Sequence, residues 1–176
     1  MIETERFMIR PLVEADVMGI FELDSNPKVH NYLGNKPIKT KAEADNIILS
    51  IQNQYQQLGI GRWAIIEKST NNFVGWTGFK YITDIVNGST HYHDLGYRLL
   101  EKYWGQGIAT ETAKACLKFG FETLKLNEVF AICDVENIGS KNILLKCGFQ
   151  LKEVFAYQDI PHYWFILTKF EWKNNQ

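Results

Sequence analysis

At residues 103–111 the chain reads Tyr103-Trp104-Gly105-Gln106-Gly107-Ile108-Ala109-Thr110-Glu111, a run rich in small residues. This run stands between a strand-like segment at residues 95–100 and a helical pattern at residues 110–124. The first turn of a helix has backbone N–H groups without an intrahelical partner, and the helix dipole adds partial positive charge there. We therefore expect the loop to bind a phosphate group of a ligand.

The composition of the 176-residue chain limits the classes of function. Hydrophobic residues make up 45% and charged residues 22%, which is typical of one globular domain, here expected over residues 1–176. A net charge of −1 gives no electrostatic reason to expect nucleic acid or an anionic membrane as a partner. The acidic N-terminus at residues 1–6 has no apolar run behind it, so we expect no signal peptide, no membrane span and a cytoplasmic location.

The three cysteines, Cys116, Cys133 and Cys147, are widely spaced and lie in apolar segments. No C-x-x-C pair is present, which argues against a zinc site, and we expect no metal. Reduced, buried thiols are the interpretation that fits this spacing.

Hydrophobic periodicity predicts seven strands and four helices. One helix starts at the capping box Thr40–Glu43 and ends before Gly59, while Gly75 and Gly78 indicate a bulge or a close backbone approach. The polar tail at residues 173–176 is expected to fray. The simplest architecture is a mixed sheet with helices on its faces. The strands are expected at residues 7–12, 62–67, 73–81, 91–100, 129–133, 149–156 and 163–170, and the other helices at residues 14–23, 110–124 and 137–147.

Two common nucleotide-binding folds do not fit the glycine loop. A P-loop ends in Gly-Lys followed by Ser or Thr, whereas Gly107 is followed by Ile108 and Ala109. A Rossmann fingerprint needs a third glycine, which is absent. A Gly-x-Gly before a helix is by itself a weak signal, so the assignment depends on what lies downstream.

A second segment, Asn137-Ile138-Gly139-Ser140, opens a short helix that ends in Lys146-Cys147-Gly148-Phe149. Together with the loop it resembles the GNAT acetyltransferase superfamily, whose pattern is Gln/Arg-x-x-Gly-x-Gly/Ala followed by Asn and Gly-Phe. Trp104 stands at the Gln/Arg position, and Gly107 and Ala109 match the small positions. Residues 4–12 and 95–111 further resemble the Rim-type branch, which acetylates ribosomal-protein N-termini.

This resemblance implies an α+β fold with a central mixed, mostly antiparallel sheet flanked by helices. It also implies that the strands at residues 95–100 and 129–133 splay apart to hold acetyl-CoA. The cofactor's diphosphate would accept hydrogen bonds from the loop and the start of the following helix, and its pantetheine arm would lie between the splayed strands. The residues expected to bind acetyl-CoA are Leu99, Leu100, Gly105, Gln106, Gly107, Ile108, Ala109, Thr110, Asn137 and Ser140.

The catalytic residues are less clearly marked. Many members of the family carry a tyrosine seven residues after the asparagine as the thiolate acid, but Leu144 stands there. Ser140 is then the candidate acid, and its alternative role is a helix serine bonded to its own backbone. Asp94, at the start of the strand beside the thioester, is the candidate base; the alternative is an exposed strand carboxylate.

The implied acceptor is a primary amine, with a protein N-terminal α-amine as the first candidate. A small amine such as an antibiotic, a polyamine or an amino acid is an alternative. A non-catalytic acyl-CoA sensor is another, because Leu144 replaces the expected tyrosine. The sequence is compatible with a monomer or a homodimer.

Overall fold

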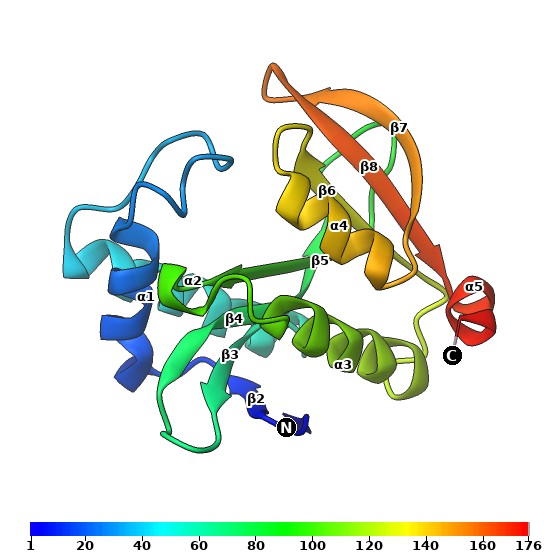
Figure 1. Cartoon of the computed structure of the whole chain (residues 1–176). Coiled ribbons are helices and arrows are strands. Elements are labelled where there is room, and N and C mark those ends of the chain that lie inside the picture. The colour runs from blue at the N-terminus through cyan, green and yellow to red at the C-terminus, as the bar shows by residue number, and fades with distance from the viewer. Residues whose placement is uncertain (176) are drawn as a thin grey trace.

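The computed structural model describes residues 1–175 and contains an eight-stranded sheet with the order β1-β2-β3-β4-β5-β6-β8-β7 (Figure 1). All neighbouring strands are antiparallel except β5 and β6, which are parallel. The expected mixed, mostly antiparallel sheet is confirmed. The strands are β1 (Ile2–Glu3), β2 (Phe7–Pro11), β3 (Arg62–Glu67), β4 (Phe73–Ile82), β5 (Tyr92–Leu99), β6 (Glu128–Asp134), β7 (Gln150–Tyr157) and β8 (Ile160–Thr168).

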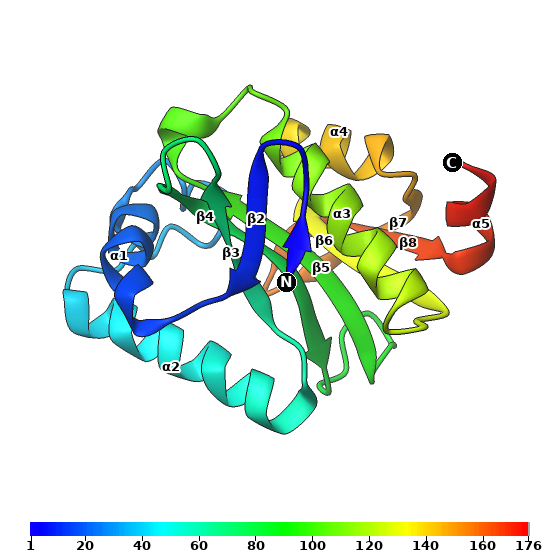
Figure 2. The same ribbon diagram turned by 90° about the horizontal axis from the view of Figure 1, so that it is seen from below.

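The helices cover both faces of this sheet (Figure 2). Because strand side chains alternate between faces, Ala64 and Ile66 of β3 pack with α1 and α2, whereas Phe79 and Leu95 pack with α3 on the other face. The helices are α1 (Val17–Ser25), α2 (Lys41–Leu58), α3 (Ile108–Glu122), α4 (Ile138–Lys146) and α5 (Lys169–Asn174). Within residues 1–175, no helix combines the length and apolarity needed to cross a membrane.

The signals at the ends of α2 act as the sequence predicts. The Thr40 side chain accepts a hydrogen bond from the Glu43 backbone N–H at 3.3 Å, and Glu43 accepts one from the Thr40 N–H at 2.8 Å. Gly59 ends the helix with φ +67°, a conformation that costs glycine little. The cysteine prediction is also confirmed: all three thiols are free and buried, and burial raises the pKa of Cys116 to about 12.

Two helix starts differ from the prediction. The helix expected at residue 110 begins at Ile108, because Gly107 takes φ +76° and serves as the N-cap. The helix expected over residues 14–23 is divided into a 3-10 turn, Glu14–Asp16, and α1. The Asp16 side chain accepts from the Val13 N–H at 2.9 Å and thereby holds the turn ahead of α1.

The C-terminal prediction is wrong in its last residues. The final strand ends at Thr168, and α5 follows where a continued strand and a frayed tail were expected; Gln176 lies outside the described residues. Thr168 and Glu171 form a capping box, and the buried Trp172 packs against Phe121 with ring centroids 5.1 Å apart. The Thr-x-x-Glu pattern at residues 168–171 was the available signal.

The strand β5 diverges from β6 along most of its length. The two pair only at Asp94 and Phe130, so the halves that follow these residues leave a gap between them. This confirms the expected splayed strands. The other edge of β5 stays paired with β4 from Tyr92 to Leu99, which keeps the gap on one side only.

Candidate active site

The glycine loop lies between β5 and α3 and presents its backbone to solvent. Gly105 and Gly107 both have positive φ, +74° and +76°, and residues 105–107 are exposed. The first intrahelical bond runs from the Glu111 N–H to the Gly107 carbonyl at 3.0 Å. In the chain up to residue 175, no hydrogen bond uses the backbone N–H groups of residues 105–110. Six free donors at the positive end of α3 fit a diphosphate.

Leu99 and Leu100 are both expected to bind a pantetheine arm through their main chains, but only Leu99 has a main-chain N–H group that is free to do so. The Leu100 N–H donates to the Val74 carbonyl at 3.0 Å, and its carbonyl accepts from the Tyr103 N–H at 2.9 Å. Leu100 is therefore already bonded within the chain. Main-chain groups alternate in direction along an antiparallel ladder, so those of Leu99 face the gap. Trp104 Nε1 donates to the Leu99 carbonyl at 2.9 Å, which leaves the Leu99 N–H free to bind.

Asn137 and Ser140 stand at the start of α4, across the gap from β5. The Asn137 side-chain oxygen caps the helix by accepting from the Ser140 N–H at 3.0 Å, and its Nδ2 keeps both hydrogens for another partner. The Ser140 Oγ lies 3.0 Å from the Tyr97 hydroxyl, which also reaches the Ser140 carbonyl at 3.1 Å. The serine hydroxyl therefore bonds to β5 rather than to its own helix.

Tyr97 is a candidate site residue that the sequence analysis missed. Its ring packs in the core and its hydroxyl joins β5 to α4 across the gap, while burial raises its pKa. Leu144, at the position of the family's tyrosine, is 1% exposed and part of the same core. The phenol that contacts Ser140 therefore comes from β5 and not from α4. Pattern alone marked Tyr97 only as a strand residue.

Asp94 lies where the gap begins, and it is not an exposed carboxylate. Its side chain is 16% exposed and pairs with Arg62 Nη2 at 2.8 Å. Arg62 also contacts the Asp94 carbonyl at 3.0 Å and lies over the Trp76 ring. Burial raises the pKa of Asp94 above its usual value, and the Arg62 guanidinium opposes this shift without cancelling it. A raised pKa suits a group that must accept a proton near neutral pH.

Asp94 and Tyr97 flank the gap from opposite faces. They are three residues apart on β5, and side chains alternate along a strand. Contacts agree with this arrangement, since Asp94 meets Arg62 on the face of α1 and α2, while Tyr97 meets Ser140 on the face of α4. An acceptor and a departing thiol could therefore exchange protons with different groups.

Residues 6–150 match the family described as Acetyltransferase (GNAT) domain. The chain belongs to the GNAT acetyltransferase family. It is 31% identical over 147 residues to the N-acetyltransferase p20 of Bacillus licheniformis, a match that covers 84% of this chain and 80% of the relative.

Two solved GNAT structures share the fold. The crystal structure of a GNAT acetyltransferase from Bacillus anthracis superposes with a TM-score of 0.80 at 24% identity, covering 96% of this chain and 98% of that one. The spermidine N-acetyltransferase of Vibrio cholerae, in complex with CoA and spermine, gives a TM-score of 0.79 at 16% identity, covering 97% and 100%. These two likenesses concern the fold; the family match over residues 6–150 is what makes this protein an N-acetyltransferase that uses acetyl-CoA.

A buried charged cluster near α1 also escaped the sequence analysis of this GNAT domain. Asp24, 2% exposed, is ion-paired with Arg98, and His30 Nε2 lies 3.7 Å from the same carboxylate. The guanidinium groups of Arg98 and Arg62 both lie over the Trp76 ring, with each Cζ 5.1 Å from the ring centroid. Burial and the nearby Arg98 lower the pKa of His30, and Asp24 opposes this shift without cancelling it. The loop pattern at residues 26–40 gave no signal for it.

Proposed function

We propose that this GNAT acetyltransferase acetylates a protein N-terminal α-amine by direct attack on acetyl-CoA. The observation that carries the proposal is the gap between β5 and β6, with the free N–H groups of residues 105–110 at its end and Asp94 and Tyr97 on its two sides. When bound, acetyl-CoA supplies an activated thioester. The chain's own residues bind the cofactor, orient it and move protons.

The binding roles follow from the groups left free. The backbone N–H groups of Gly105, Gln106, Gly107, Ile108, Ala109 and Thr110 donate to the diphosphate. The Leu99 N–H and the Asn137 Nδ2 donate to the amide carbonyls of the pantetheine arm. These donors are fixed by secondary structure before the cofactor arrives, so little ordering is needed on binding.

The proton chemistry divides between the two faces of β5. Asp94 acts as the general base for the acceptor ammonium, since its raised pKa favours proton uptake. Ser140 donates to the departing thiolate, and the Tyr97 hydroxyl, 3.0 Å away, orients the serine hydroxyl. Neither role needs the tyrosine that Leu144 replaces.

The acceptor assignment rests on the Rim-type motifs and on the charges beside α1. A pocket there is lined by Glu22, Asn26, Leu100, Glu101 and Lys102. Its two carboxylates are already paired, Glu22 with Lys102 at 3.0 Å and Glu101 with Lys28 at 2.5 Å. A polyamine is recognised by uncompensated negative charge, and these pairs leave little of it. A small amine stays the second candidate because the Vibrio cholerae structure with this fold is a spermidine N-acetyltransferase.

The acceptor class can be decided by thiol release from acetyl-CoA across a panel of amines. We expect kcat/KM to be about tenfold higher for peptides with a free N-terminus than for spermidine or free amino acids. The same peptides with an acetylated N-terminus are the matched control and should give no release. A preference for spermidine would establish a small amine as the acceptor. No thiol release with any amine would favour a non-catalytic acyl-CoA sensor.

The role of Asp94 can be read from a pH–rate profile. Because an acid with a raised pKa must be ionised to accept a proton, kcat/KM of the wild type should fall as the pH drops through that pKa. Asp94→Asn should lower kcat by about a hundredfold and remove this acidic limb. If Asp94→Asn acts only by breaking the ion pair between Asp94 and Arg62, the rate should fall while the acidic limb of the profile remains. A retained acidic limb would therefore exclude Asp94 as the base.

A further inference from the structure

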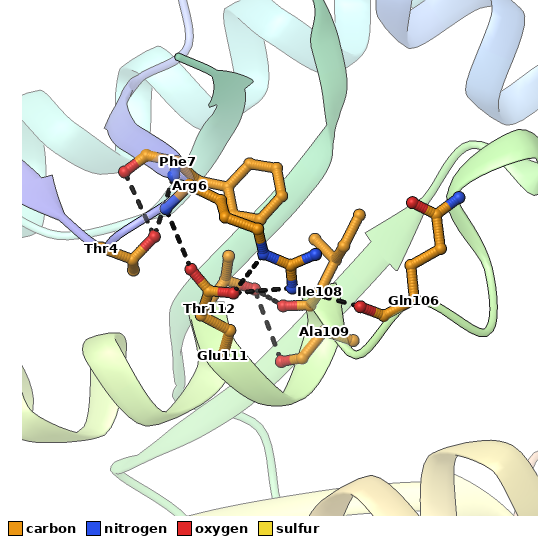
Figure 3. A network of polar contacts seen from close by, with 8 residues as sticks. All are labelled: Thr4, Arg6, Phe7, Gln106, Ile108, Ala109, Glu111 and Thr112. Carbon is orange, nitrogen blue, oxygen red and sulfur yellow. Dashed lines mark hydrogen bonds and ion pairs between the residues drawn. The ribbon is translucent and has the colours of Figure 1, made fainter. Parts of the chain in front are cut away.

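Arg6, in the bend between β1 and β2, reaches the glycine loop at Gln106, 100 residues away in the sequence (Figure 3). Its Nη2 donates to the Gln106 carbonyl at 3.1 Å, and its Nε donates to Glu111 Oε2 at 2.8 Å. The Arg6 backbone N–H also donates to Glu111 Oε1 at 3.3 Å. The guanidinium therefore joins the loop to the first turn of α3.

The bond to Gln106 sets the direction of the next donor in the loop. A trans peptide is planar, so the N–H of Gly107 points opposite to the carbonyl of Gln106. Because Arg6 holds that carbonyl on its own side, the Gly107 N–H points away from Arg6. Gly105 and Gly107 both have positive φ, and glycine leaves such a conformation easily. Contacts from outside the loop, such as the one from Arg6, therefore help to keep the loop in one conformation.

The bond to Glu111 has an electrostatic consequence. Glu111 lies in the first turn of α3, close to the donors that would bind two phosphates. Burial tends to raise its pKa, but the nearby Thr4 hydroxyl and Arg6 outweigh this, lower the pKa and keep the carboxylate ionised. An unpaired carboxylate there would repel a diphosphate. Arg6 Nη2 lies 2.7 Å from Oε2 and compensates this charge, and 43% of its side chain stays exposed.

We propose that Arg6 is a positioning residue for the cofactor diphosphate, which aligns the Gln106–Gly107 peptide and neutralises Glu111. This inference rests on the proposed assignment of residues 105–110 to the diphosphate. A diphosphate-bearing donor should depend on Arg6, and a donor that ends at pantetheine should not. The residue acts on cofactor affinity and has no part in proton transfer.

The test compares acetyl-CoA with S-acetylpantetheine as acyl donors for the wild type and for Arg6→Gln. We expect the KM for acetyl-CoA to rise about tenfold with kcat within twofold, and kcat/KM for S-acetylpantetheine to stay unchanged. Arg6→Lys, which keeps the charge without the planar fork, should recover part of the loss. Adding Glu111→Gln to Arg6→Gln should recover part of it as well, because the uncompensated charge is removed.

Lys68→Gln is the matched control. Lys68 Nζ holds the same N-terminal segment by donating to Glu3 at 2.9 Å and to the Thr4 carbonyl at 2.8 Å, but it does not contact the loop. The proposal would be overturned if Lys68→Gln raised the KM for acetyl-CoA as much as Arg6→Gln does. It would also be overturned if Arg6→Gln lowered kcat/KM equally for acetyl-CoA and S-acetylpantetheine, because Arg6 would then only stabilise the fold. Failure of the wild type to bind CoA in calorimetry would overturn the diphosphate assignment itself.

Discussion

Gly107→Glu is expected to weaken the binding of acetyl-CoA by about a hundredfold or more. Gly107 has φ +76°, where a residue with a side chain is strained, and it is the N-cap of α3, the helix proposed to bind the diphosphate. A glutamate there would also place a negative charge among the donors of residues 105–110. The dissociation constant of CoA, measured by titration calorimetry, reports the loss directly.

Gly88→Glu separates the backbone cost from the cofactor effect. Gly88 has nearly the same conformation, φ +72°, and open space around a Cβ, but it lies in the turn between β4 and β5. The two variants should lose similar amounts of stability, and only Gly107→Glu should lose affinity. If Gly107→Glu folds and binds CoA as the wild type does, the phosphate loop has been assigned wrongly.

Much of the fold could be predicted from the sequence because the signals for its helices and strands are local. The capping box at Thr40 and the glycine at residue 59 each act over one helical turn, and both lie where the sequence predicts. The helix α5 was missed although its Thr-x-x-Glu signal is equally local. Its six residues follow a buried strand directly, and only the packing of Trp172 on Phe121 shows that the pattern changes there.

The candidate site likewise contains local motifs, which the sequence predicts, and pairs of residues distant in sequence, which it does not. The loop at residues 105–110 and the cap at Asn137 are contiguous motifs, so spacing located them. Tyr97 and Ser140 are 43 residues apart, and Arg6 and Glu111 are 105 apart. Such pairs exist only once the sheet has formed, and nothing in the local pattern distinguishes Tyr97 from any other strand aromatic. Sequence reasoning therefore proposed the backbone donors of the loop, but it could not find the side-chain pairs that the folded sheet brings together.

Gly75→Ala is expected to lower the free energy of unfolding by about 3 kcal/mol. Gly75 has φ +155°, and an added Cβ would lie 2.1 Å from the Arg98 carbonyl oxygen and 2.8 Å from the Leu99 Cα. Both atoms belong to the backbone of β5, so no side-chain rotation relieves the clash and the strands must separate. Urea unfolding with an unchanged m-value measures the effect.

The same substitution should also raise the KM for acetyl-CoA, because Gly75 is opposite Leu99 in the β4–β5 ladder and Leu99 faces the gap. Gly139→Ala is the matched control. Gly139 is a helical position in α4 whose nearest atom to an added Cβ is the Asn137 Oδ1 at 3.6 Å, so alanine should be neutral or stabilise by up to about 1 kcal/mol. A Gly75→Ala protein as stable as the wild type would show that β4 and β5 are not held this closely, and the gap beside Leu99 would then have a different shape.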